Sequence, residues 1–525
     1  MNAAPVRLIA AAIVLVATTL LYTHRLGDTP AYLSLDEAHI ANQAYSLATT
    51  GRTLNGERLP VFISLEDPLG EHYTLPWGAT RYHPVGFYLV ASALLVAPLS
   101  EWSVRSPFAI AAVLNIVLVY LLAHRWYGSR WVAGGAAALL TMTPAHFILS
   151  RMTLDYLLPV TFVLAWLLSL SHLTAKPRRR TAVITGAVLG AGCFSFVSSW
   201  VMMPIYAAIS AAVIAFHLRR RDLVVPLAAG FAAALGPLVW LAWHPEVPAN
   251  LIRQYQAGEG RPSVLSAIAV GGGVGEALKN TLAVYWSYFD PSFLFVTGGA
   301  SRMVSTGLIG VWPVGMAALL LLGVVPMVRG ERRIETLVAL AGLLLAPLPA
   351  AMKGEPFAIH RAVTLLPFGV LLAAAGLRSL DRRRPLAAAA IVVATISCGA
   401  QFTGFVRDYF AGQRLRSAHA MDPTAFRETA SVLLAAGGDA PAIVLPAGLY
   451  DISAKWRFYC TKAAREDLLQ RTRYLDGGPA DPQTLERGAL VVRQTASAPP
   501  AAGWRTVATP VDITGASPLT ILRRE

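Results

Sequence analysis

The chain has 525 residues, of which 55% are hydrophobic and 14% are charged, and its mean hydropathy is +0.52. An ordinary soluble protein carries about 25% charged residues, so this composition excludes a simple soluble protein and predicts a polytopic α-helical membrane protein. The net charge of +14 does not indicate nucleic-acid binding, because the arginines gather in short clusters between apolar segments, as they do in cytoplasmic loops.

The apolar segments have the length that crosses a bilayer as a helix. With the basic clusters assigned to the cytoplasm, we expect about eleven transmembrane helices in the cell inner membrane, a cytoplasmic N-terminus and a periplasmic C-terminus. Pro84–Leu99 is too short for a span, and we assign it to the membrane interface. The basic clusters are Lys176–Arg180, Arg219–Arg221, Arg329–Arg333 and Arg378–Arg384. The expected spans are 7–23, 106–123, 131–149, 157–172, 181–198, 200–217, 223–243, 307–328, 334–350, 362–377 and 385–401.

This topology predicts two domains. Residues 1–402 form the transmembrane domain, with a first external loop at 24–105 that carries juxtamembrane helices and a second large external segment at 244–306. Residues 403–525 alternate helix-like and strand-like runs, which predicts a small soluble periplasmic α/β domain. The three cysteines show no disulfide or metal spacing. The apolar N-terminus lacks a small-residue cleavage site, so we expect an uncleaved anchor.

An acidic pair, Asp36 and Glu37, directly follows the first predicted span. Apolar residues then recur at helical spacing, so a helix begins there. Ser34 and Glu37 have the spacing of a capping box, and Asp36 would also favour the positive end of that helix. Capping and catalysis both remain open for the pair, since a helix start also holds a carboxylate rigidly.

Cationic residues lie at other predicted external positions. Arg105 opens the second span, where an arginine is commonly a snorkelling anchor, although its place on the outer face also favours an anion-binding role. Lys353, His360 and Arg361 lie at one membrane edge and would suit a phosphate, which favours several charge-assisted donors.

Further polar residues on the same face have a supporting or a purely structural interpretation. Arg151 and Asp155 share a short turn and would neutralise each other or assist a substrate. His83 belongs to the polar first loop, and Tyr288 belongs to an aromatic run that an interfacial belt would also explain.

Five sequence blocks together resemble the GT-C membrane glycosyltransferases, and most of all glycosyltransferase family 39, which includes protein O-mannosyltransferases and lipid A aminoarabinose transferase. The resemblance covers about 400 residues of the membrane part, and the blocks occur in the family's order. The blocks are Asp36-Glu37 with Ala44, Gly51, Asn55-Gly56 and Pro60; Arg105-Ser-Pro107; Pro144 with Ser150-Arg151 and Asp155; Tyr288 to Phe295 with Gly298; and Ala346-Pro347 and Pro349 with His360-Arg361-Ala362 and Leu366-Pro367.

The resemblance implies transfer of a sugar, with inversion, from a polyprenyl-phosphate-linked donor to an envelope acceptor on the periplasmic face: a lipid, lipopolysaccharide or protein hydroxyl. Asp36 would be the general base, and Glu37 would assist it. The donor phosphate would be bound by Arg105, Lys353, His360 and Arg361, and the acceptor or the base would be supported by Arg151, Asp155, His83 and Tyr288.

Two alternatives stay open. Some enzymes of this superfamily use a divalent cation, for which Glu37 and Asp155 would be ligands, but the sequence shows no ligand spacing and we expect no required metal or other cofactor. A carrier or flippase for a lipid-linked sugar is the second functional hypothesis. Transporters place ionisable residues near the bilayer midplane, whereas the polar residues here gather at one face, which favours the enzyme.

Overall fold

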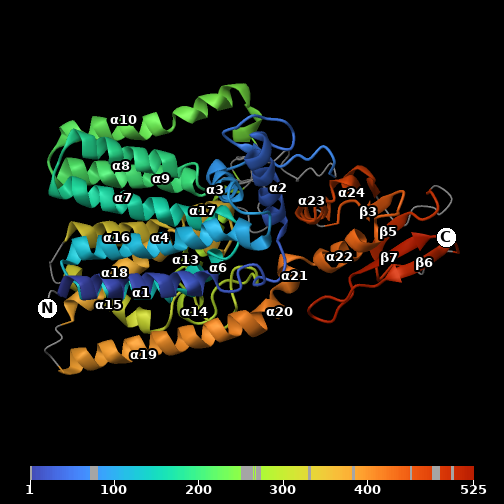
Figure 1. The fold of residues 1–525 in the computed structure, drawn as a ribbon. Coiled ribbons are helices and arrows are strands. Elements are labelled where there is room, and N and C mark those ends of the chain that lie inside the picture. The colour runs from blue at the N-terminus through green and yellow to red at the C-terminus, as the bar shows by residue number, and fades with distance from the viewer. Residues whose placement is uncertain are drawn as a thin grey trace. The chain divides into compact units, whose positions relative to one another are not determined.

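A computed structural model gives the fold of the chain. It describes residues 3–70, 81–249, 264, 267, 273–328, 333–380, 385–449, 452–475, 485–497 and 502–525. Most of the predicted basic clusters Arg329–Arg333 and Arg378–Arg384 and part of the external segment 244–306 lie outside the described residues. Figure 1 shows the described elements and their labels.

The chain forms two compact units. Unit 1 comprises residues 1–24, 83–85 and 108–409, and unit 2 comprises residues 25–82, 86–107 and 410–525. This grouping differs from the predicted division at residue 402, because most of the first external loop belongs to the same unit as the C-terminal tail.

Unit 1 is mainly helical, and its described residues contain no strand. Its helices pack side by side in Figure 1, among them α7, α8 and α9. Small residues allow the closest packing: a Cβ on Gly186 of α8 would lie 2.0 Å from the Leu227 carbonyl oxygen of α10. The helices are α1 (Ala3–Thr23), α4 (Glu101–Tyr127, which begins in unit 2), α5 (Arg130–Thr141), α6 (Pro144–Leu149), η1 (Asp155–Leu157), α7 (Leu158–Ala175), α8 (Arg179–Gly192), α9 (Ser199–Ala212), η2 (Val213–His217), η3 (Arg221–Leu223), α10 (Val224–Ala234), η4 (Gly236–Trp243), α13 (Val274–Ser287), α14 (Pro291–Phe295), α15 (Gly315–Val328), α16 (Ile334–Leu345), α17 (Leu348–Lys353), η5 (Ile359–Ala362), α18 (Leu365–Ser379) and α19 (Pro385–Asp408).

Each of the eleven predicted spans contains a helix. Within the described residues, five helices are long and apolar enough to cross a membrane, and a sixth span results if the pair Arg221–Ala234 and Gly236–Trp243, bent by 44°, is one element. The count of eleven therefore stays a prediction. The expected span 307–328 is too long at its start, because α15 begins only at Gly315; Gly307, with φ of +70°, and Pro313 disfavour helix before it.

Unit 2 contains a mixed five-stranded sheet with the order β4-β3-β5-β7-β6. Strand β3 is parallel to β4 and β5, whereas β7 is antiparallel to β5 and β6. A core of Ala442, Val444, Leu485, Ala489 and Val491 forms one cluster, against which Leu475 and Trp504 pack. The elements are α2 (Leu35–Thr50), β1 (Ile63–Ser64), β2 (Arg81–Tyr82), α3 (Pro84–Leu94, which begins in unit 1), η6 (Tyr409–Gln413, which also begins in unit 1), α20 (Arg414–Arg416), α21 (Ala418–Met421), α22 (Phe426–Ala436), β3 (Ile443–Pro446), α23 (Ile452–Lys462), α24 (Glu466–Gln470), β4 (Thr472–Leu475), β5 (Leu490–Gln494), β6 (Trp504–Ala508) and β7 (Leu519–Arg524).

Contacts between the first loop and the tail explain why both belong to unit 2. Helix α2 packs against α23, and the Asn42 side-chain amide donates a hydrogen bond of 2.7 Å to the Ala454 carbonyl. Lys462 pairs with Glu101 at 2.6 Å, and the Arg457 guanidinium pairs with Asp67. These partners are more than 350 residues apart in sequence, so a division read from hydropathy does not reveal them.

Candidate active site

The acidic pair divides into one buried and one accessible carboxylate. Ser34 caps α2: its hydroxyl accepts from the Glu37 backbone N–H, and the Glu37 carboxylate accepts from the Ser34 N–H. The predicted capping box is therefore confirmed. Glu37 is fully buried, whereas Asp36, one position earlier, is partly exposed.

Arg105 neutralises Glu37 in a fully buried ion pair. Its Nε donates to Glu37 Oε1 at 2.8 Å and its Nη2 to Oε2 at 3.2 Å, and both side chains have 0% exposure. The same guanidinium donates to the carbonyls of Leu26, Pro30 and Tyr32, at 3.2, 2.8 and 2.8 Å. These contacts engage all five guanidinium N–H groups.

The geometry thus disagrees with two expected roles. Arg105 cannot bind the donor phosphate without giving up hydrogen bonds that hold the loop 26–32, and it has no exposed surface from which to reach one. Glu37 likewise cannot act on a substrate or hold a metal ion without breaking a buried pair, which is strongly destabilising. Both residues instead fix the start of α2, which carries Asp36.

Asp36 is held by a residue that the sequence did not single out. The Tyr82 hydroxyl donates a hydrogen bond of 3.0 Å to Asp36 Oδ1. Tyr82 is placed by the β1–β2 hairpin, in which it pairs with Ile63, and the neighbouring Arg81 makes two bonds to the Glu57 carboxylate, at 2.8 and 2.7 Å. The contact joins residues 46 positions apart, so no local sequence signal predicts it.

The predicted phosphate-binding residues of unit 1 lie on one short segment. Lys353 ends α17 and is 5% exposed, Gly354 then adopts φ of +82°, and His360 and Arg361 follow on η5. Glu355 accepts from Arg361 Nε at 3.0 Å and lies 3.9 Å from His360 Nε2. This carboxylate offsets part of the positive charge expected for a phosphate site.

Aromatic side chains hold this segment in place. The Tyr288 hydroxyl donates to the Glu355 carbonyl at 2.7 Å and accepts from the Ala358 N–H at 2.9 Å. The ring of Tyr156 lies against His360, with centroids 4.7 Å apart, and the Arg361 guanidinium lies 5.8 Å from the Phe196 ring centroid. Tyr288 is therefore a structural support of the segment. Tyr156 and Phe196 also contact it, and no sequence pattern singles these two residues out.

His360 and His83 are both neutral over the physiological range. Burial, with a smaller contribution from the Arg361 charge, lowers the pKa of His360 to about 3, and burial lowers the pKa of His83 to about 3. The Trp200 ring centroid lies 6.2 Å from that of His83. A neutral His360 acts toward a phosphate as a hydrogen-bond donor and not as a cation, so the positive charges in the segment are those of Lys353 and Arg361.

Arg151 and Asp155 lie in the turn between α6 and α7. Arg151 is fully buried and donates to the carbonyls of Tyr22, in the last turn of α1, and of His24, just after it, at 2.8 and 2.6 Å. A cation at the carboxyl end of a helix stabilises it, so Arg151 secures α1. Asp155 is 8% exposed and begins η1, which packs against η5.

Two other features bear on ligands. No group of three or more His, Cys, Asp or Glu side chains among the described residues is arranged to hold a metal ion. An apolar cavity of about 340 Å³ opens between α5, α15, α18 and α19, beside Arg130 and Leu377. Leu377 lies near the end of α18 opposite to η5, so this cavity does not contain the Lys353–Arg361 segment.

The fold is that of the GT-C membrane glycosyltransferases, and the chain is an integral membrane protein. The crystal structure of ArnT from Cupriavidus metallidurans bound to undecaprenyl phosphate matches it with a TM-score of 0.56 and 13% identity over 98% of each chain. The apo form of the same ArnT gives a TM-score of 0.50 and 15% identity, again over 98% of both chains. At these identities the likeness concerns the fold.

Part of the chain also matches a known protein family by sequence. Residues 81–243 match the family described as dolichyl-phosphate-mannose-protein mannosyltransferase, so this part of the chain is similar to that family. The matched segment contains His83, Arg105, Arg151 and Asp155 but not Asp36. A comparison with curated protein sequences finds no match.

Proposed function

We propose that the protein is a glycosyltransferase that moves a sugar from a polyprenyl-phosphate-linked donor to a hydroxyl of a lipid, lipopolysaccharide or protein acceptor of the cell envelope. The observation that carries the proposal is Asp36: a partly exposed carboxylate, oriented by Tyr82 and set on a helix start that a buried ion pair fixes. The GT-C fold, and the undecaprenyl phosphate bound to ArnT, support the class of donor.

In this reaction Asp36 acts as general base. It accepts the proton of the acceptor hydroxyl while the hydroxyl oxygen forms a bond to the anomeric carbon. The bond from that carbon to the phosphate oxygen breaks, and polyprenyl phosphate leaves with the electron pair. Because attack and departure occur on opposite sides of the carbon, the anomeric configuration inverts. A positioned base contributes about 10²–10⁴-fold to such a step.

Lys353, His360 and Arg361 are proposed to bind the donor phosphate. The growing negative charge on the leaving phosphate would be stabilised by the two cations and by a hydrogen bond from the neutral imidazole. Asp155, beside η5, is proposed to support the acceptor. No required metal is proposed, and the reaction takes place on the periplasmic face of the inner membrane.

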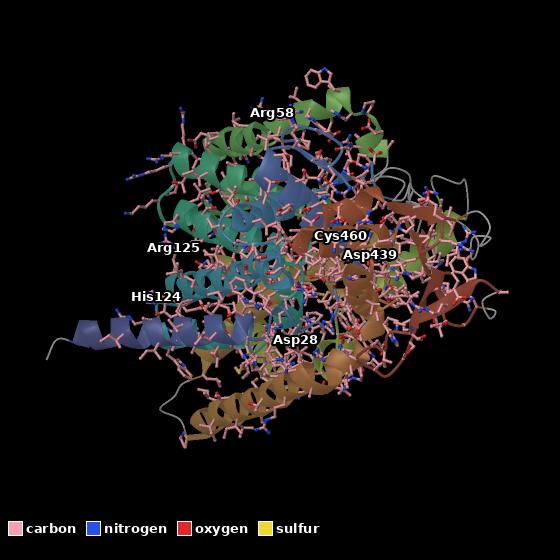
Figure 2. All side chains as sticks on the ribbon, turned by 45° about the vertical axis from the view of Figure 1, so that its right-hand side comes forward. Asp28, Arg58, His124, Arg125, Asp439 and Cys460 are labelled. Carbon is pink, nitrogen blue, oxygen red and sulfur yellow. The ribbon has the colours of Figure 1, made fainter. Side chains whose placement is uncertain are left out.

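The test uses purified full-length protein, undecaprenyl-phosphate-linked pentoses and hexoses, and envelope lipids, lipopolysaccharide and hydroxyl-containing peptides as acceptors. We expect sugar transfer with release of undecaprenyl phosphate, lowered by about 10²–10⁴-fold in Asp36→Asn. The matched control is Asp439→Asn, a change at the exposed tail carboxylate labelled in Figure 2.

Two results would contradict the proposal. Full activity in Asp36→Asn would remove the general-base assignment. Movement of the lipid-linked sugar across liposome membranes, with no transfer to any acceptor, would indicate a carrier in place of an enzyme.

A further inference from the structure

The loop before Asp36 is bound by arginines from distant parts of unit 2. Asp28 is labelled in Figure 2. Arg414 donates hydrogen bonds to Asp28 Oδ1, at 2.6 Å, and to the Asp28 carbonyl, at 3.1 Å. Partial burial raises the pKa of Asp28, but the hydrogen bonds and charges of Arg25 and Arg414 outweigh this effect and hold it below its ordinary value. Asp28 therefore stays ionised, and its pairing with the tail persists at neutral pH.

Three residues further along, a second tail arginine binds the loop. Arg427 of α22 donates a hydrogen bond of 2.7 Å to the Ala31 carbonyl, and its guanidinium carbon lies 4.9 Å from the centroid of the Tyr32 ring. The Tyr32 hydroxyl accepts from the Ile513 N–H at 3.2 Å, and the Tyr32 carbonyl accepts from Arg105. Tyr32, four residues before Asp36, is thus held at its ring, its hydroxyl and its carbonyl.

The tail also holds α2 after Asp36. The buried hydrogen bond from Asn42 to the Ala454 carbonyl joins the second turn of α2 to α23. Tail contacts therefore bracket Asp36, at Ala31–Tyr32 before it and at Asn42 after it. Two tail arginines thus bind carbonyls of this one loop, at Asp28 and Ala31. A reacting group that such contacts place is sensitive to their loss, because a misplacement of about 1 Å can cost about 10²-fold in rate.

We propose that Arg427 is a positioning residue for Asp36, assisted by Arg414, so that the tail is a structural part of the catalytic apparatus. The inference rests on the proposed role of Asp36. Arg427 touches no reacting atom in this scheme. It acts by fixing the Ala31–Tyr32 backbone, and through it the orientation of the first turn of α2.

The experiment compares Arg427→Gln with Arg505→Gln, a change at an exposed arginine on β6 of the same tail. Hydrogen–deuterium exchange is followed in the peptide covering residues 28–37, and kcat and the donor KM are measured on the same preparations. In Arg427→Gln we expect faster exchange in that peptide and a kcat about 10- to 100-fold lower, the range for misplacement of a reacting group, with the KM changed less than about twofold. The control should match the wild type in all three.

Arg427→Lys is the rescue variant. It keeps one charged donor for the Ala31 carbonyl but loses the planar guanidinium over Tyr32, so exchange and kcat should both lie between those of the wild type and of Arg427→Gln. A role in stability alone would lower the amount of folded protein without lowering kcat per active molecule.

The outcomes separate this inference from the proposed function. Unchanged hydrogen exchange in Arg427→Gln would show that Arg427 does not fix the Ala31–Tyr32 backbone. Faster exchange with an unchanged kcat would show that this contact does not contribute to catalysis. Full activity of Asp36→Asn would instead contradict the proposed general base, and it would not change the result of the exchange measurement.

Discussion

The neighbouring carboxylates Asp36 and Glu37 should respond in opposite ways to the loss of their charge. Glu37→Gln removes the partner of a fully buried arginine and weakens the hydrogen bonds that Glu37 accepts from Arg105 and from the Ser34 N–H. Breaking a buried ion pair on one side costs about 3–5 kcal/mol. Asp36→Asn alters a partly exposed side chain that keeps an oxygen for the Tyr82 hydroxyl, so its effect on stability should be small.

A matched control sets the scale of this effect. Glu57 pairs with Arg81 in the same loop, but the side chains are 25% and 13% exposed, against 0% for both members of the buried pair. Glu57→Gln should therefore cost below about 1 kcal/mol. The order of destabilisation expected from burial is Glu37→Gln first, then Glu57→Gln, with Asp36→Asn close to the wild type.

The assay is the apparent unfolding temperature of the detergent-solubilised protein, followed by sugar transfer measured on the folded fraction. Glu37→Gln should lower the unfolding temperature the most, and Asp36→Asn should lose transfer without a thermal change. A Glu37→Gln variant with wild-type thermal stability and no transfer would refute the reasoning, because it would make Glu37 a reacting group and not a support.

Three further predictions concern Tyr82, which contacts Asp36, and the proposed phosphate-binding residues Arg361 and His360. Tyr82→Phe removes the hydrogen bond that orients Asp36, so kcat should fall about tenfold, the equivalent of one charge-assisted hydrogen bond, with the donor KM unchanged; steady-state kinetics checks this, and a raised KM would argue against it. Arg361→Gln should lower kcat/KM for the polyprenyl-phosphate-linked sugar about 10- to 100-fold, because the phosphate loses a charged hydrogen-bond donor. The control is Arg125→Gln at the end of α4, labelled in Figure 2, which should not lower it. Equal kinetics for the two variants would exclude a role of Arg361 in binding the sugar donor. His360 has a pKa of about 3 in the folded state and about 6.5 when unfolded, so between these values the unfolded state binds more protons. The stability of the wild type should therefore fall as the pH drops below 6.5, by at most about 2 kcal/mol at pH 5. His360→Gln should lose less thermal stability than the wild type between pH 7 and pH 5, and an identical loss would mean that the imidazole is protonated in the folded protein.

Much of the local structure could be predicted from the sequence. The capping box at Ser34 and Glu37 follows from a three-residue spacing. The apolar stretches predict helices because a helix pairs all of its backbone hydrogen-bonding groups within one segment. The strand-like runs of the tail appear as β3 and β5. Each of these features depends on neighbours within a few positions, which is the range over which a pattern in the sequence carries information.

The roles of the charged residues could not be assigned in this way. Arg105 has the same residue type, membrane-edge position and chain order whether it binds a phosphate or is buried against Glu37. Its five hydrogen bonds reach residues 68 to 79 positions away, and only their geometry excludes the expected role. Glu37 changes from a catalytic candidate to a support for the same reason.

The sequence by itself determined that this is a helical membrane protein, because bilayer thickness and backbone hydrogen bonding constrain every short stretch of the chain independently. Only the tertiary structure decided which carboxylate is exposed, that Tyr82 orients it, and that the first loop shares a unit with the tail. Those properties depend on solvent access and on contacts between residues tens to hundreds of positions apart, for which the order of residues along the chain gives no distance.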